Sequence, residues 1–192
     1  MDPLVVRGPL FRGVSLLAML MASLLFQGCA EGLIPVNYSP GSVKSASGAL
    51  SVAEFKYLPS MPTAQDPIPS NLIMNTAMGE VTIDRDVKTF VRDAIFAELR
   101  FVGIRMNDKS KVLTGDIEEF MMDDLGFSTD WTLRIHYHVH ATATNREIYQ
   151  SVKTVRRNTA KFINVFGAMN ETIRLNAEQL IDDPEFIKAI NQ

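Results

Sequence analysis

The sequence predicts an α+β fold, a two-layer α/β sandwich with helices on one face of a mostly antiparallel sheet. Within residues 111–157, three consecutive segments alternate apolar and polar residues as strands do. Residues 84–102 and 162–181 instead repeat apolar residues every three or four positions, as amphipathic helices do. The order strand, helix, three-strand meander, helix implies that the helices pack on one face of the sheet. The other face is then left to water or to a partner.

The first strand is expected over residues 50–58, an apolar-rich segment that Pro59 ends. Residues 59–70 predict a loop, because each of their prolines lacks the N–H that a sheet requires and biases the residue before it to extended geometry. Residues 71–83 give an ambiguous pattern, with a short extended piece expected at 79–83.

Both predicted helices carry signals at their ends. Asp84 is placed to cap the N-terminus of the first helix, and Gly103 stands where a left-handed residue closes its C-terminus. The Asp183-Pro184 pair ends the second helix and starts a short last helix, expected over residues 185–190.

The three strands of the meander are expected over residues 111–123, 131–143 and 147–157. The apolar phase of the first strand slips near Glu118 and Glu119, which predicts a β-bulge. The spacing around Asn145-Arg146 predicts a tight hairpin between the second and third strands.

The N-terminal segment has the three-part layout of a secretory signal, expected over residues 1–28. Arginines precede an uncharged apolar run, residues 14–26, which is shorter than the roughly 20 apolar residues of a membrane-spanning helix. Gly28-Cys29 resembles the end of a bacterial lipobox, in which the cysteine thiol receives a diacylglyceryl group and becomes the new N-terminus. Cys29 is the only cysteine in the chain and is therefore the expected lipidation site.

The residue that follows Cys29 bears on the destination of the protein. It is Ala30 rather than Asp, which in the Gram-negative lipoprotein sorting pattern that this segment resembles favours the outer membrane, with the domain in the periplasm. Phe26 and Gln27 depart from the usual lipobox, which has Leu three places and Ala or Ser two places before the cysteine. The alternative is ordinary cleavage after the small-x-small sequence that ends at Ala30, which would release a soluble periplasmic protein.

Residues 29–48 are expected to form the lipidated N-terminus and a flexible tether, because small and polar residues dominate them. The periplasmic α/β domain then occupies residues 49–192, the size of one ordinary domain. The net charge of −3 argues against a nucleic acid partner, since binding phosphates needs a concentrated positive surface. A single cysteine leaves no internal disulfide.

The sharpest local feature is a row of three histidines. His136, His138 and His140 share one strand face with Thr132 and Arg134. Residues two apart on a strand lie about 6.5–7 Å apart, near enough for two imidazoles to share a zinc or copper ion. However, no carboxylate is clearly directed at the same place, and Arg134 opposes a cation. A solvated or partner-binding surface is therefore the favoured interpretation, with a metal site or a pH-sensitive interface as alternatives.

Other charged clusters have structural explanations. An acidic group near the end of the first meander strand is interpreted as solvated rather than catalytic, and a basic group in the third as a source of cross-strand ion pairs. The acidic group is Glu118, Glu119, Asp123 and Asp124, and the basic group is Lys153, Arg156, Arg157 and Lys161. The sequence has neither a nucleophile elbow nor a phosphate-binding glycine loop. It therefore predicts a protein that is not an enzyme.

Four short segments occur in a suggestive order. They are Val52-Ala-Glu-Phe, Asp84-Arg-Asp-Val at the head of a helix that ends in Gly103, Leu113-Thr-Gly-Asp-Ile, and Asp183-Pro-Glu-Phe-Ile. Together they resemble the YajG-like group of uncharacterised bacterial lipoproteins, over residues 50–190. The resemblance implies an outer-membrane lipoprotein with a small periplasmic α/β domain, and similar folds serve envelope machines as auxiliary lipoproteins. It brings no catalytic residues.

These observations favour a non-catalytic cell-envelope lipoprotein whose domain binds a protein partner through the open sheet face or an edge strand. One alternative is a lipoprotein that handles lipids or small ligands for a transport system. Another is a metal-binding module at His136, His138 and His140. No cofactor is expected beyond the covalent lipid on Cys29.

Overall fold

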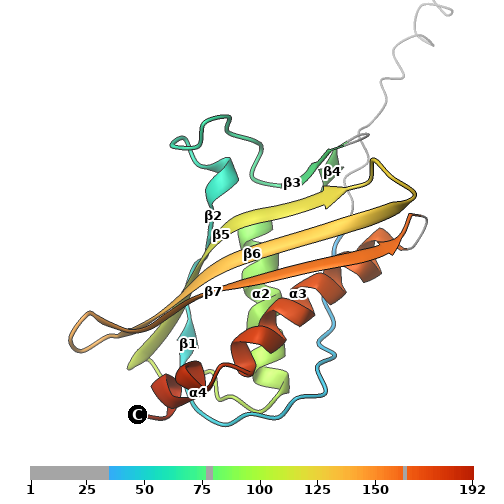
Figure 1. The fold of residues 1–192 in the computed structure, drawn as a ribbon. Helices are drawn as coiled ribbons and strands as arrows, with labels where there is room; N and C mark the ends of the chain where they lie inside the picture. The colour runs from blue at the N-terminus through green and yellow to red at the C-terminus, as the bar shows by residue number, and fades with distance from the viewer. Residues whose placement is uncertain (1–34, 77–79, 162–163) are drawn as a thin grey trace, which may run out of the picture. The chain divides into compact units, whose positions relative to one another are not determined.

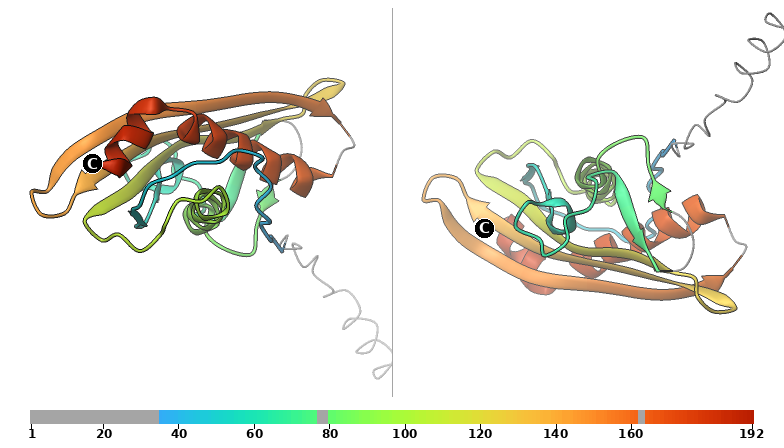
Figure 2. Two further views of the ribbon diagram at one scale, coloured as in Figure 1. Left: turned by 90° about the horizontal axis from the view of Figure 1, so that it is seen from below. Right: turned by 90° about the horizontal axis from the view of Figure 1, so that it is seen from above.

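The computed structural model describes residues 35–76, 80–161 and 164–192 (Figure 1). They form a seven-stranded, mostly antiparallel sheet with helices on one face, so the predicted α+β fold is confirmed (Figures 1 and 2). The strands are β1 (Ser51–Val52), β2 (Lys56–Tyr57), β3 (Leu72–Asn75), β4 (Val81–Thr82), β5 (Lys111–Asp123), β6 (Ser128–Ala141) and β7 (Arg146–Ala160). The helices are the short 3-10 helix η2 (Leu58–Ser60), α2 (Val87–Phe101), α3 (Val165–Ile181) and α4 (Pro184–Asn191).

The meander β5-β6-β7 is the largest part of the sheet. Its register shifts between Ile117 and Glu119, which confirms the predicted bulge. A hairpin joins β6 to β7 as predicted, but its turn lies before Arg146: the strands close at the pair Ala141 and Arg146 and leave a four-residue turn. Asn145 in this turn has a φ of 49°, a left-handed conformation that asparagine tolerates. The β6-β7 pair also contains a bulge close to this turn, where the register shifts between Val139 and His140.

The other edge of β5 is covered by three short strands in succession. β1, β2 and β3 each pair with it in parallel, and β4 pairs with β3. The predicted first strand is therefore interrupted. Val52 pairs with Leu113 and Lys56 pairs with Asp116. The segment from β1 to β2 therefore contains one residue more than the stretch of β5 that it runs beside. Phe55, within the interruption, is buried in the core.

The helices bury the apolar stripes that their spacing predicts. In α2 the buried side chains include Val87, Phe90, Val91, Ala94, Ile95 and Leu99. The predicted cap at Asp84 is wrong, because α2 begins at Val87 with Asp86 as the N-cap residue. Gly103 does close the helix with a φ of +108°, as predicted. The Asp183-Pro184 pair also acts as predicted, since the Asp183 carboxylate accepts the Glu185 N–H at the start of α4.

Residues 36–48, here called the N-terminal strap, pack on the domain. Composition predicts a flexible tether up to residue 48, whereas Val36 and Ser42 are buried in the structure. The reason is Glu98, a fully buried carboxylate on α2. It accepts hydrogen bonds from the Tyr38 hydroxyl at 2.6 Å and from the Gly41 and Ser42 N–H groups at 3.0 and 3.2 Å. The folded domain therefore begins near residue 36 rather than at residue 49.

The predicted signal segment, residues 1–28, and Cys29 lie outside the described residues, so both stay predictions. Among the described residues, no helix has the length and apolar character required to cross a membrane.

Candidate functional site

The candidate site lies on the face of the sheet opposite the helices. Along β6, Trp131, Leu133, Ile135, Tyr137 and Val139 are buried in the core. The residues that alternate with them, from Thr132 to His140, therefore point to the other face. We call this surface of β5, β6 and β7 the open face. It holds the three histidines in one row, as their spacing predicts.

Thr132 differs from the other residues of this row. It is only 8% exposed. The prediction that Thr132 belongs to an accessible partner surface is therefore wrong. Its neighbours in register are Met121 on β5 and Arg156 on β7, two long side chains beside a short one. The accessible row begins at Arg134.

Arg134 is held by two carboxylates of β5. Its guanidinium lies 3.4 Å from Glu118 and 3.1 Å from Glu119. The bulge places both glutamates within reach of the same arginine, because Glu118 is the extra residue between the pairs of Ile117 and Glu119. Their charges are thus engaged by a cation, and they do not form a free carboxylate pair suited to acid and base catalysis.

Three basic residues in or directly after β7 bind side chains or carbonyls outside the neighbouring strands. Lys153 pairs with Asp183 at 2.6 Å, and Arg157 pairs with Glu171 on α3 at 2.6 Å. Lys161 donates to the carbonyls of Asp124 and Gly126 in the turn between β5 and β6. Their partners are therefore helices and turn carbonyls rather than the neighbouring strands that the sequence suggests.

The histidine rings stand side by side along β6. The ring centroids of His136 and His138 are 4.1 Å apart, and those of His138 and His140 are 6.2 Å apart. Nδ1 of His136 lies 3.9 Å from the Glu118 carboxylate on β5.

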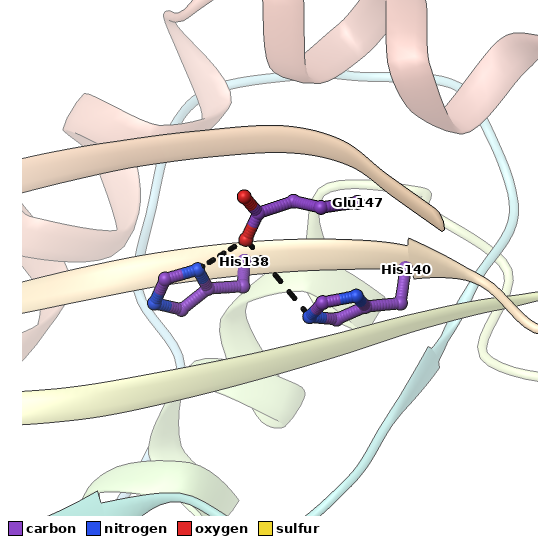
Figure 3. A group of neighbouring side chains, drawn as sticks. All are labelled: His138, His140 and Glu147. Carbon is purple, nitrogen blue, oxygen red and sulfur yellow. Dashed lines mark hydrogen bonds and ion pairs between the residues drawn. The ribbon is translucent and has the colours of Figure 1, made fainter. Parts of the chain in front are cut away.

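Glu147 on β7 completes a group with the other two histidines (Figure 3). Its Oε1 atom lies 2.5 Å from His138 Nδ1 and 3.9 Å from His140 Nε2. One potential ligand atom from each of His138, His140 and Glu147 lies within 4.8 Å of the others. All three residues are partly exposed, with side-chain exposures of 19%, 38% and 33%.

Glu147 was not predicted from the sequence as part of the site. The expected strand ends, residues 143 and 147, would place Glu147 opposite Ala143, whereas the observed turn and the bulge place it opposite His140. The usable signal was the asparagine itself, since a left-handed residue is typical of longer hairpin turns as well as of two-residue ones. In the structure a carboxylate does lie beside the histidines, contrary to the expectation that weighed against a metal.

Comparisons with known proteins bear on the fold alone. No family model matches the chain, and no curated protein matches it either. Among solved structures, the chain is similar to protein XCC0632 from Xanthomonas campestris, described by the family model DUF330. The TM-score is 0.53 and the identity 14%, covering 78% of this chain and 90% of that chain. The domain therefore shares the fold of that protein.

Two further structures are similar. The hypothetical protein CT253 from Chlamydia trachomatis has a TM-score of 0.51 at 10% identity, covering 75% of this chain and 99% of that one. PelC from Paraburkholderia phytofirmans, which forms a dodecamer, has a TM-score of 0.40 at 13% identity, covering 74% of this chain and 93% of that one. Membership of the YajG-like group stays a prediction.

Proposed function

We propose that the chain is a non-catalytic lipoprotein of the bacterial cell envelope, anchored by lipid on Cys29, whose domain binds a protein partner through its open face. The proposed localisation in the cell envelope is supported by the N-terminal signal and by the single cysteine at the lipobox position. One acyl chain binds membranes only marginally, and a second makes the anchorage stable. The resemblance to the YajG-like group agrees with this localisation.

The observation that carries the proposal is Val152, in the middle of the open face. It lies opposite His136 on the neighbouring strand and is 46% exposed. Thr154, two residues further along the same strand, stands opposite Arg134. An exposed valine beside arginine, histidine and threonine offers both the apolar contact and the hydrogen-bonding groups that protein interfaces combine.

Handling of lipids or small ligands has less support. Among the described residues, a cavity at the end of the interface between the sheet and α3, beside Trp131 and Val165, holds about 80 Å³. Sites for small molecules usually hold about 300–1,000 Å³. A larger hollow of about 470 Å³ lies outside this interface, on the surface beyond the C-terminal end of α2, where Arg100 and Arg105 line it.

The anchor is tested by replacing Cys29 with serine and Ala30 with aspartate in separate variants. Because Cys29 is the only cysteine, C29S should lose all acyl label and leave the membrane fraction. A30D should keep the label and move from the outer to the inner membrane. A C29S protein that stays with the membrane would refute lipid anchorage.

The partner surface is tested by photocrosslinking in intact cells. A photoreactive residue in place of Val152 should give one discrete protein adduct. The same residue in place of Val43, which is 92% exposed on the N-terminal strap, is the matched control and should give none. Absence of an adduct at position 152, or equal labelling at both positions, would contradict the proposal.

A further inference from the structure

His138, His140 and Glu147 bring three potential metal-ligand atoms within 4.8 Å of one another. Ligand atoms about 2.0–2.2 Å from a tetrahedral Zn²⁺ lie about 3.4 Å from one another. In the structure, Glu147 Oε1 lies 2.5 Å from His138 Nδ1 and 3.9 Å from His140 Nε2. Each differs from the tetrahedral value by less than about 1 Å, a change that small side-chain rotations can supply.

The backbone holds the three residues in place. His138 and His140 are two apart on β6 and therefore share a face. The bulge between Val139 and His140 places Glu147 opposite His140, one strand away. Ligands on two paired strands of a sheet are more firmly positioned than ligands on a loop, so little conformational entropy is lost when an ion binds.

The surrounding charges permit a cation. Arg134, which appeared from the sequence to oppose one, is engaged by Glu118 and Glu119. Arg146 precedes Glu147 directly, so alternation along the strand directs its side chain away from the open face. Lys111, at the start of β5, donates instead to the backbone carbonyls of Ile190 and Gln192 at the end of α4.

We infer that His138, His140 and Glu147 bind a divalent transition-metal ion on the open face, with water completing the coordination. Two imidazole nitrogens and one carboxylate oxygen suit Zn²⁺, Cu²⁺ or Ni²⁺, whereas Mg²⁺ and Ca²⁺ prefer sets of oxygen ligands. The inference does not depend on lipidation of Cys29 or on partner binding.

The test is a zinc titration of the full-length protein, purified in detergent without a polyhistidine tag, in competition with a chromophoric zinc chelator. We expect one Zn²⁺ per chain, and no displacement by a thousandfold excess of Mg²⁺. The variants H138A, H140A and E147Q should each weaken zinc binding at least tenfold. Their circular dichroism should match the parent protein, since all three side chains are partly exposed.

His136 provides the matched control. It is the same residue type on the same face of the same strand, but its Nδ1 atom lies beside Glu118. H136A should therefore change zinc affinity by less than threefold. Failure of the parent protein to bind zinc would overturn the inference, and so would binding that survives any one of the three ligand changes or falls equally in H136A.

Discussion

The ring of Phe55 occupies the space that a side chain at Gly115 would need. A Cβ atom on Gly115 would lie 2.7 Å from Cε2 and 2.9 Å from Cδ2 of this ring. The ring also packs edge-on against Tyr137, with 6.1 Å between centroids. The interruption between β1 and β2 thus carries a buried aromatic residue into the core, over the one position of the neighbouring strand that lacks a side chain.

Replacing Gly115 with alanine should therefore destabilise the domain by about 1–3 kcal/mol, the usual cost of an extra methyl group in a filled core. Urea unfolding measures this free energy. Gly126→Ala is the matched control, because its Cβ atom would approach nothing closer than 3.9 Å, and it should leave the stability unchanged within about 0.5 kcal/mol. Equal stability of the two variants would show that the ring has room to move.

The N-terminal strap gives a second prediction, through Glu98. An amide at this position keeps only one acceptor oxygen, so Glu98→Gln leaves the N–H of Gly41 or of Ser42 without its acceptor. We expect a loss of about 1–3 kcal/mol and faster amide hydrogen exchange at both residues. The control is Glu171→Gln, a half-exposed carboxylate on α3 that pairs with Arg157. Unchanged exchange at Gly41 and Ser42 would contradict the role given to Glu98.

A third prediction concerns Asn176, a buried amide that joins α3 to the sheet. Its Oδ1 atom accepts the Tyr137 hydroxyl at 2.8 Å, and its Nδ2 atom donates to the carbonyls of Leu133 and Lys153. Tyr137→Phe keeps the ring but leaves Oδ1 without a donor, so it should cost about 1–3 kcal/mol in urea unfolding. Tyr38→Phe, which removes one of several bonds to Glu98, should cost less. A cost for Tyr137→Phe below that of Tyr38→Phe would show that Oδ1 finds another donor.

The sequence predicted the features that local periodicity encodes. The stripe from Val87 to Leu99 and the phase slip at Glu118 follow from spacing within one element. Glu98 was not predicted as a core residue, because its partners come from residues 38–42, far away in the chain, and nothing local distinguishes it from a solvated glutamate. Glu147 was missed because its place depends on the hairpin register, where a small slip changes every cross-strand neighbour.

The last prediction concerns acid. Burial raises the pKa of Asp183, but hydrogen bonds from Lys153, from Tyr149 and from the Glu185 N–H outweigh it, so the pKa is lowered in the folded protein. A lowered pKa contributes stability above the unfolded value of about 3.9, and this contribution is lost as the pH falls from there through the folded value.

Asp183→Asn should therefore lower the free energy of unfolding by about 1.5–3 kcal/mol at pH 7, the range for hydrogen bonds to a charged group. Asparagine caps helices as well as aspartate does, so the cap can be kept, while the charge and the acceptor oxygen that faces Lys153 and Tyr149 are lost. The difference from the parent protein should shrink below about pH 4 as the native carboxylate is protonated.

The control is Asp182→Asn, at the neighbouring position. It removes a carboxylate that is 55% exposed and pairs with Lys44, and it should cost less than about 1 kcal/mol. Urea unfolding of the three proteins at pH 7 and pH 3 measures both effects. An Asp183→Asn deficit that is equally large at pH 3 would mean that hydrogen bonding and packing at Asp183, rather than its charge, hold α4 to β7.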